Sequence, residues 1–337
     1  MRVLDAEGSP AEIGYAIGSA AADLVHEAIS RICRFDLPAG ELSARLGALE
    51  LLLARELPHV LEEADGLAEG AGVSRQDALA LSVCSDLSGR LPAWCSLVAV
   101  EGEEGILVGK NLDTPEEMAP IQVVERMAPD GALRFAHVTT AGAMWTDGGV
   151  NEAGLALVNA SLAPAGANPE GLPDGILVRE LLARCADVQE AVALATSRRV
   201  RTLGENVLLA DAGGRTAVVE MLPAGNAVRE GEPAAACNHV LSEKLHAAMS
   251  REDPLRENSE RRFERLREAS RAGRRWTITE LVSLLEDPGK GIRQDGSAGI
   301  WTVATFVLSP SERRMWVSEQ GGEQAELVEV ETSLVRT

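Results

Sequence analysis

The spacing of the apolar residues changes abruptly near Leu91-Pro92, and this change constrains the fold more than any other feature of the chain. Before it, apolar residues recur at helical spacing through residues 10–90, opened by Ser9-Pro10, a capping residue followed by a first-turn proline. After it come short runs of β-type residues separated by turn residues, such as SLVAV, GILVGKNLD and GLALVNASL. We therefore predict a helical segment over residues 1–94 and a sheet-rich core over residues 95–337.

Helical patterns return three times within the sheet-rich core, at about residues 174–197, 256–272 and 277–286. Between them, the residues Asp211-Ala-Gly-Gly214 separate two β-type runs and predict a hairpin. The order of the elements is typical of an α+β fold in which helices pack on antiparallel sheets.

Charge and cysteine usage exclude several classes of function. The net charge of −20 disfavours partners with phosphate backbones and anionic membrane surfaces, so we expect neither nucleic-acid nor membrane binding. The N-terminus lacks the apolar stretch of a secretory signal, which predicts a cytoplasmic protein. Five scattered cysteines without a CxxC pair fit neither a disulfide framework nor a zinc site, and we expect no metal and no cofactor.

Cys95 is the cysteine whose position favours a catalytic role over a role in core packing. It begins the first β-type run after the junction, whereas Cys33, Cys84 and Cys185 lie among apolar residues in helical patterns and are expected in the core. A thiol nucleophile needs a base and donors for an oxyanion. Asp113, with Lys110 and Asn111 just before it, ends the return strand of a predicted hairpin and could therefore lie beside Cys95. The alternative is a hairpin with a polar exit turn.

The ordered set of motifs is similar to one enzyme family. Cys-Ser followed by Gly-Lys-Asn-Leu-Asp resembles the nucleophile region of the acyl-coenzyme A:6-aminopenicillanic-acid acyltransferases, cysteine N-terminal-nucleophile (Ntn) hydrolases related to bile-salt and penicillin V amidases. Further segments agree in order, among them GSPAEIGYAIG, GVNEAGLALVNASL, NVLLADAGGRTAVVE, CNHVLSE and NSERRFERL. The resemblance implies a four-layer αββα sandwich preceded by a helical pro-region, and an autocatalytic cut between Trp94 and Cys95. The α-amine that the cut frees on Cys95 would then serve as the general base.

The resemblance also implies roles for individual residues. Asp113 would orient the thiol and the α-amine, and the Asn238 amide would donate to the oxyanion, unless it only satisfies local backbone at a strand end. Arg262 resembles an active-site arginine of the related amidases, although its charged helix could equally present a solvated face. Asn159 is a second candidate polar site residue, with Ser161 as its competitor.

Two positions depart from the family pattern. Lys110 stands where the bile-salt amidases have arginine, which removes a bidentate grip on a carboxylate. Trp94 stands where the penicillin acyltransferase has glycine before the nucleophile, and a bulky residue there could slow the cut.

The sequence thus predicts an autoproteolytic amidohydrolase or acyltransferase that forms an S-acyl-Cys95 intermediate with a small amide substrate, in specialised metabolism by analogy. One alternative moves the acyl group from coenzyme A to an amine. Another is a non-catalytic scaffold that binds a small acylated ligand, and a third is a Cys-His hydrolase that uses His239. The cleaved fragments are expected to stay associated, and homo-oligomerisation remains open.

Overall fold

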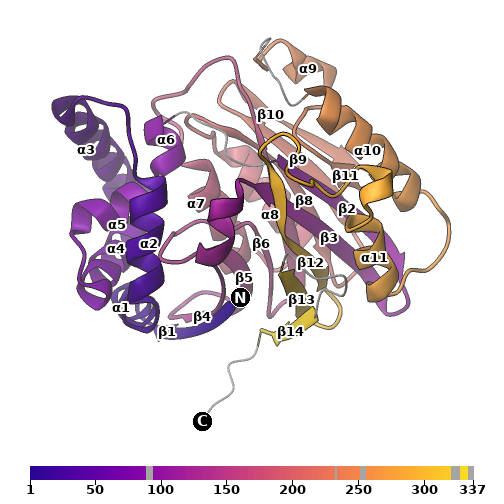
Figure 1. Cartoon of the computed structure of the whole chain (residues 1–337), viewed down its shortest axis with the longest axis horizontal. Helices are drawn as coiled ribbons and strands as arrows, with labels where there is room; N and C mark the ends of the chain where they lie inside the picture. Colours follow the sequence, from indigo (N-terminus) through magenta and orange to yellow (C-terminus); the bar gives the residue numbers. More distant parts are fainter. Residues whose placement is uncertain (89–93, 232–233, 251–255, 320–326, 333–337) are drawn as a thin grey trace.

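The computed structural model describes residues 1–88, 94–231, 234–250, 256–319 and 327–332. Two β-sheets stack face to face at its centre (Figure 1). The larger has the strand order β1 (Arg2–Gly8), β4 (Gln122–Pro129), β5 (Phe135–Thr140), β6 (Gly148–Asn151), β7 (Leu155–Leu162), β8 (Gly204–Asp211), β9 (Thr216–Leu222), β10 (Gly225–Glu230). The smaller has the order β11 (Ala235–Ala236), β2 (Trp94–Gly102), β3 (Gly105–Thr114), β12 (Trp301–Ser309), β13 (Arg314–Glu319), β14 (Leu327–Glu331).

Helices cover the outer face of each sheet. One apolar core joins the larger sheet to α1 (Pro10–Ala20), α2 (Ala22–Ile32), α3 (Ala39–Glu56), α4 (Pro58–Ala71), α5 (Arg75–Ser82), α6 (Cys84–Ser88), α7 (Asp174–Arg184) and α8 (Val188–Ser197). A separate core joins the smaller sheet to α10 (Arg256–Ser270) and α11 (Ile278–Leu285). The short α9 (Glu243–His246) lies beside β10, and two 3₁₀ turns span Glu116–Ile121 and Pro288–Lys290.

Alternation along β2 shows how the layers are joined. Leu97 and Ala99 point into the apolar core between the two sheets, whereas Val98 and Val100 point outward to α10 and α11. Because successive side chains of a strand face opposite sides, a strand buried on both faces reads as a continuous apolar run, as SLVAV does. The α+β class and the four-layer αββα arrangement predicted from the sequence are confirmed.

The segment before Cys95 is not wholly helical, because it begins with a strand that the sequence did not predict. Residues 2–8 form β1, which pairs in parallel with β4 and buries only Leu4 and Ala6. Consequently Cys95 lies in the second strand of the chain rather than the first, and it is the second residue of that strand, after Trp94. Pro92 and Ala93, placed in a loop by the sequence, lie outside the described residues. The boundary between residues 94 and 95 as a division of the chain stays a prediction.

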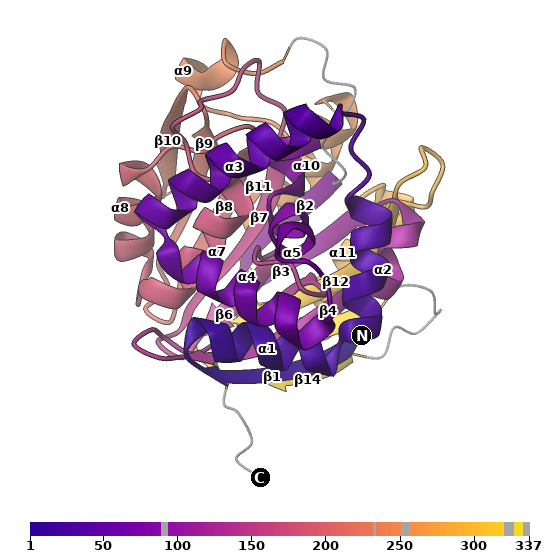
Figure 2. The ribbon, with the colours of Figure 1, turned by 90° about the vertical axis from the view of Figure 1, so that its left-hand side faces the viewer.

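Helices α1 and α4 pack with their backbones in direct contact (Figure 2). A Cβ on Gly66 would lie 1.9 Å from the carbonyl oxygen of Ala11, and one on Gly14 would lie 2.0 Å from that of Glu63. Only glycine fits such an approach, so these positions fix how the N-terminal helices pack together. Among the helices that the structure describes, none is long and apolar enough to cross a lipid bilayer.

Candidate active site

The Cys95 side chain opens into a cavity of about 110 Å³. Cys95 lies on the face of β2 that points between the sheets, and only 2% of the residue is exposed. The cavity is walled by β3, β7 and β8, by the start of α7, and by segments near α5 and α6. Its apolar part includes Leu112, Met118 and Trp145. A concave, largely apolar pocket with a few convergent polar groups is the usual form of a small-molecule site.

The Asn238 side chain forms a hydrogen bond with the backbone of Cys95. The Cys95 amide donates to Asn238 Oδ1 at 3.0 Å, and Asn238 Nδ2 donates to the carbonyl oxygen of Ser161 at 2.9 Å. The structure therefore brings Asn238 to the nucleophile, but through its carbonyl oxygen. The Nδ2 group, to which the resemblance assigns the oxyanion, donates to the Ser161 carbonyl oxygen, and its role toward an oxyanion stays a prediction.

Arg262 is completely buried, so the solvated-face interpretation of this residue was wrong. Its Nη1 donates to the carbonyl oxygen of Cys95 at 2.5 Å and to Ser96 Oγ at 3.0 Å, and its Nη2 donates to Asn238 Oδ1 at 2.9 Å. Its Nε donates to Asn258 Oδ1 at 2.6 Å, one turn earlier on α10. The planar fork of the guanidinium thus fixes both Cys95 and Asn238 from the outer face of the sheet.

Lys110 supplies positive charge inside the cavity. It lies on β3, its Nζ donates to the Asp147 carbonyl oxygen at 2.6 Å and to Asn159 Oδ1 at 3.0 Å, and it is fully buried. Burial raises the pKa of the Cys95 thiol to about 12, while the nearby Lys110 ammonium and a hydrogen bond from the Asp113 backbone amide act in the opposite direction. In the intact chain the thiol is therefore protonated near neutral pH and needs a base.

Asp113 reaches the position that the hairpin predicts. It pairs with Trp94 in the β2–β3 register, and its Oδ1 accepts a hydrogen bond from Thr302 Oγ1 at 2.6 Å. Its Oδ2 has no hydrogen-bond partner within the described part of the chain. Burial raises the pKa of this carboxyl to about 7, and the Arg262 charge opposes that rise.

Two further candidates lie apart from the thiol. Asn111 Nδ2 donates to the Leu285 carbonyl oxygen at 2.8 Å, and its Oδ1 accepts from Thr305 Oγ1 at 2.9 Å, so it anchors α11 on the outer face of the sheet. His239 Nδ1 contacts Ser259 Oγ at 2.7 Å and its ring packs edge-on against Phe263. Burial lowers the pKa of His239 to about 4, and nothing in its contacts supports the Cys-His alternative.

Sequence reasoning missed Asp147, Asp174 and Glu205, which line the same cavity. Asp174 begins a helix and Glu205 lies in a strand, so each has an ordinary local explanation in the sequence. Only the packing of α7 over β8 brings the two carboxyls together.

Comparison with known proteins identifies the family of the chain. The profile of the acyl-coenzyme A:6-aminopenicillanic acid acyl-transferase family matches residues 100–324. A curated relative, the 40 kDa form of acyl-coenzyme A:6-aminopenicillanic-acid-acyltransferase from Emericella nidulans, is 28% identical over 188 residues, which cover 52% of this chain. The match spans only about half of that relative's length, 51%.

Among solved structures, a variant of conjugated bile acid hydrolase from Clostridium perfringens superposes with a TM-score of 0.52 at 13% identity. The superposition covers 69% of this chain and 92% of that one, and it shows a shared Ntn-hydrolase fold. Penicillin V acylase from Agrobacterium tumefaciens gives a TM-score of 0.45 at 13% identity over 70% of this chain and 86% of that one, too low to add to the fold assignment. The fold, together with the profile match over two thirds of the sequence, shows that the chain belongs to the acyl-coenzyme A:6-aminopenicillanic acid acyl-transferase family.

Proposed function

We propose that the protein cleaves itself between Trp94 and Cys95 and then breaks a linear amide bond of a small acylated amine through a thioester on Cys95. One observation carries the proposal. The thiol of Cys95 opens into a cavity while its own backbone nitrogen, the future α-amine, is held by Asn238 Oδ1 at 3.0 Å. Nucleophile and base would thus belong to one residue, which matches the absence of a histidine among the residues that line the cavity in the described chain.

The self-cleavage needs only the chain itself and one water molecule. Cys95 Sγ attacks the Trp94 carbonyl carbon, the Trp94–Cys95 carbon–nitrogen bond breaks, and the acyl group moves to sulfur while the nitrogen takes up the thiol proton. Water then hydrolyses the thioester, leaving a carboxylate on Trp94 and a free α-amine and thiol on Cys95.

The freed amine supplies the base that the buried thiol lacks. An unperturbed α-amine has a pKa of about 7.7–8.0, so near neutral pH a good fraction is neutral and accepts the thiol proton. Asn238 Oδ1 accepts a hydrogen bond from the resulting ammonium, and Lys110 stabilises the thiolate by its charge. Substrate acylates the sulfur and releases its amine, after which water releases the acid.

We favour water over an amine as the acyl acceptor. The sequence carries no glycine-rich phosphate-binding loop that would support coenzyme A binding. Transfer to an amine would use the same S-acyl intermediate and would appear as acylated amine among the products.

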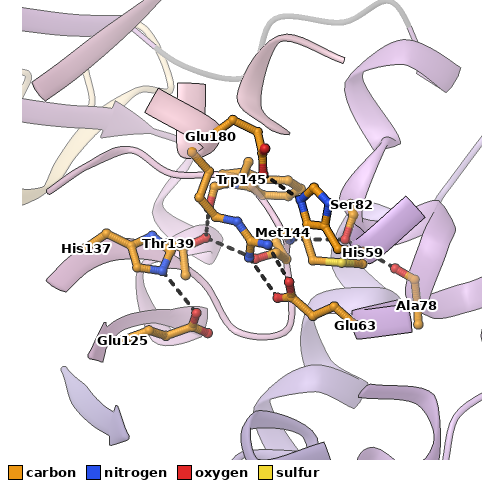
Figure 3. Close-up of polar contacts among 12 residues, drawn as sticks. His59, Glu63, Ala78, Ser82, Glu125, His137, Thr139, Met144, Trp145 and Glu180 are labelled. Carbon is orange, nitrogen blue, oxygen red and sulfur yellow. Dashed lines mark hydrogen bonds and ion pairs between the residues drawn. The ribbon is translucent and has the colours of Figure 1, made fainter. Parts of the chain in front are cut away.

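The structure gives a reason why the fragments would stay together after the cut. Glu63 accepts a two-pronged ion pair from Arg179, and His59 contacts Glu180 at 2.7 Å, both across the proposed fragment boundary. Ser82 Oγ accepts a hydrogen bond from the Met144 amide at 3.1 Å. Figure 3 shows these contacts, which join α4 and α5 to α7 and to the loop between β5 and β6.

Mass spectrometry under denaturing conditions tests the proposal. We expect fragments of residues 1–94 and 95–337 instead of one 35.7 kDa chain, and an acyl group on the peptide that begins with Cys95 after brief exposure to N-acyl amines. Cys95→Ala should abolish both, whereas Cys237→Ser, at a buried thiol outside the cavity, should abolish neither. Label on another residue would refute Cys95 as the nucleophile, and no label at all in a cleaved preparation would favour a non-catalytic scaffold.

A further inference from the structure

Two buried carboxyl groups in the cavity wall take no part in the proposed mechanism. Asp174, the first residue of α7, is 5% exposed, and Glu205, on β8, is 3% exposed. Both line the cavity into which Cys95 opens. Carboxylates are rarely buried to this degree unless they are paired with a cation or a metal ion.

Within the described part of the chain, the pair lacks such a partner. Asp174 Oδ1 and Glu205 Oε2 receive no N–H or O–H donor, and the two carboxyl groups interact with each other instead. Lys110 is close enough to lower the pKa of Glu205, but its Nζ is already bonded to the Asp147 carbonyl oxygen and to Asn159. Burial raises the pKa of both carboxyls, and at Asp174 the backbone amides of Asp174 and Gly175 oppose this rise only in part.

Two further acids lie near the pair. Asp147 lines the same cavity and opposes ionisation of Glu205, while its own carboxylate forms an ion pair with Lys110 at 3.5 Å. Asp86 has a pKa raised to about 7 by burial and by Asp174. Arg201 offsets part of this effect on Asp86. The acidic side of the cavity is therefore poorly suited to an anionic substrate group and well suited to a cation.

The carboxyl pair also lies close to the reacting centre. The Cys95 amide bonds Asn238 at 3.0 Å, Asn238 bonds the Ser161 carbonyl oxygen at 2.9 Å, and Ser161 Oγ bonds Glu205 Oε1 at 3.3 Å. Three hydrogen bonds thus connect the nucleophile's nitrogen to the acidic wall. A substrate group that reaches this wall would lie in the same cavity as the Cys95 thiol.

We propose that Asp174 and Glu205 form a subsite for a cationic nitrogen, a primary ammonium or a guanidinium, carried by the substrate. This deepens the proposed function and rests on it. A bound cation would donate to the two carboxylate oxygens that have no donor and would displace the proton that the acids share. The cation could belong to the acyl portion or to the leaving amine, and the experiment separates the two.

Matched substrate pairs test the subsite. On the acyl side, ε-aminocaproyl p-nitroanilide is compared with heptanoyl p-nitroanilide, which replaces the ammonium with a methyl group. On the amine side, N-hexanoyl cadaverine is compared with N-hexanoyl hexylamine. We expect the cationic member of one pair to be preferred about 10- to 100-fold in kcat/KM, the range for hydrogen bonds to a charged group. The side that shows the preference is the side that carries the cation.

Neutral, isosteric variants identify the groups responsible. The double variant Asp174→Asn, Glu205→Gln should lose most of the preference, measured as the ratio of kcat/KM within each substrate pair, and Glu205→Gln alone should lose part of it. Asp130→Asn, an exposed acid that changes the net charge equally per residue, should change nothing. Circular dichroism melting curves confirm that each variant is folded.

The outcomes separate this inference from the proposed function. Acylation of Cys95 by all substrates without charge preference refutes the subsite and leaves the amidase intact, and so does a preference that survives in the double variant. If no substrate acylates Cys95, the proposed function fails. The subsite is then judged by calorimetric titration of Cys95→Ala with both substrate pairs, and it is refuted if neither ε-aminocaproyl p-nitroanilide nor N-hexanoyl cadaverine binds more tightly than its uncharged counterpart.

Discussion

Arg262 offers the sharpest test of how this site is built. Replacing it by methionine keeps most of the side-chain length but removes every donor to Cys95, Ser96, Asn238 and Asn258. A buried acceptor left without a donor costs about 1–3 kcal/mol, and removing one member of a buried charged arrangement costs about 3–5 kcal/mol. Asn238 Oδ1 keeps its bond from the Cys95 amide, so we expect a net loss of about 3–4 kcal/mol in the free energy of unfolding.

The measurement is urea denaturation followed by circular dichroism, made in a Cys95→Ala background so that self-cleavage does not complicate the transition. Arg265→Met is the matched control, because Arg265 lies on the same helix with half of its side chain exposed in an ion pair with Glu268. Its effect should stay within about 0.5 kcal/mol. Arg262→Lys restores the charge without the planar fork and should fall between the two. Equal losses for Arg262→Met and Arg265→Met would refute the role assigned to the buried guanidinium.

Three further predictions concern other parts of the molecule. The folded-state pKa of Asp113, about 7, exceeds the ordinary value of about 3.9, so its contribution to stability is present below pH ~4 and lost as the pH rises to ~7. Asp113→Asn should reduce this loss of stability with pH, measured by urea denaturation at a series of pH values. An unchanged dependence of stability on pH would contradict the shift. Lys110→Met should raise the pKa of the Cys95 thiol and slow its alkylation by iodoacetamide, and an unaltered rate would show that the cation does not act on sulfur. Gly66→Ala should destabilise the fold by about 1–3 kcal/mol through overpacking. Gly47→Ala, in open space on α3, should instead stabilise it by about 0.5–1 kcal/mol. The melting temperatures of the two variants compare these effects.

Local periodicity was enough to predict the layers and the hairpin that carries Cys95 and Asp113, because strand and helix patterns depend on residues close together in the sequence. Strand β1 escaped prediction because an edge strand with two buried residues, Leu4 and Ala6, leaves a short and weak alternation. Arg262 was ambiguous for a related reason. It lies four residues before Leu266 on a helix rich in charge, so its inward direction is visible only once the buried face is known.

Other features depend on contacts that no local pattern records. The side of the Asn238 amide that faces Cys95 is decided by Ser161 and Arg262, which are far apart in the sequence. The meeting of Asp174 with Glu205 likewise depends on how α7 packs over the larger sheet.

The parallel pairing of β1 with β4 changes what folding would mean for a cleaved protein. All seven residues of β1 are in register with β4, so a chain cut before Cys95 would hold a sheet built from two separate polypeptides. Its unfolding would release two molecules, and its refolding would become second order, with a melting temperature that rises with protein concentration. The 95–337 fragment alone would expose β4 as a bare sheet edge, the kind of surface on which chains aggregate. Dilution would then destabilise the processed protein but not its uncut precursor.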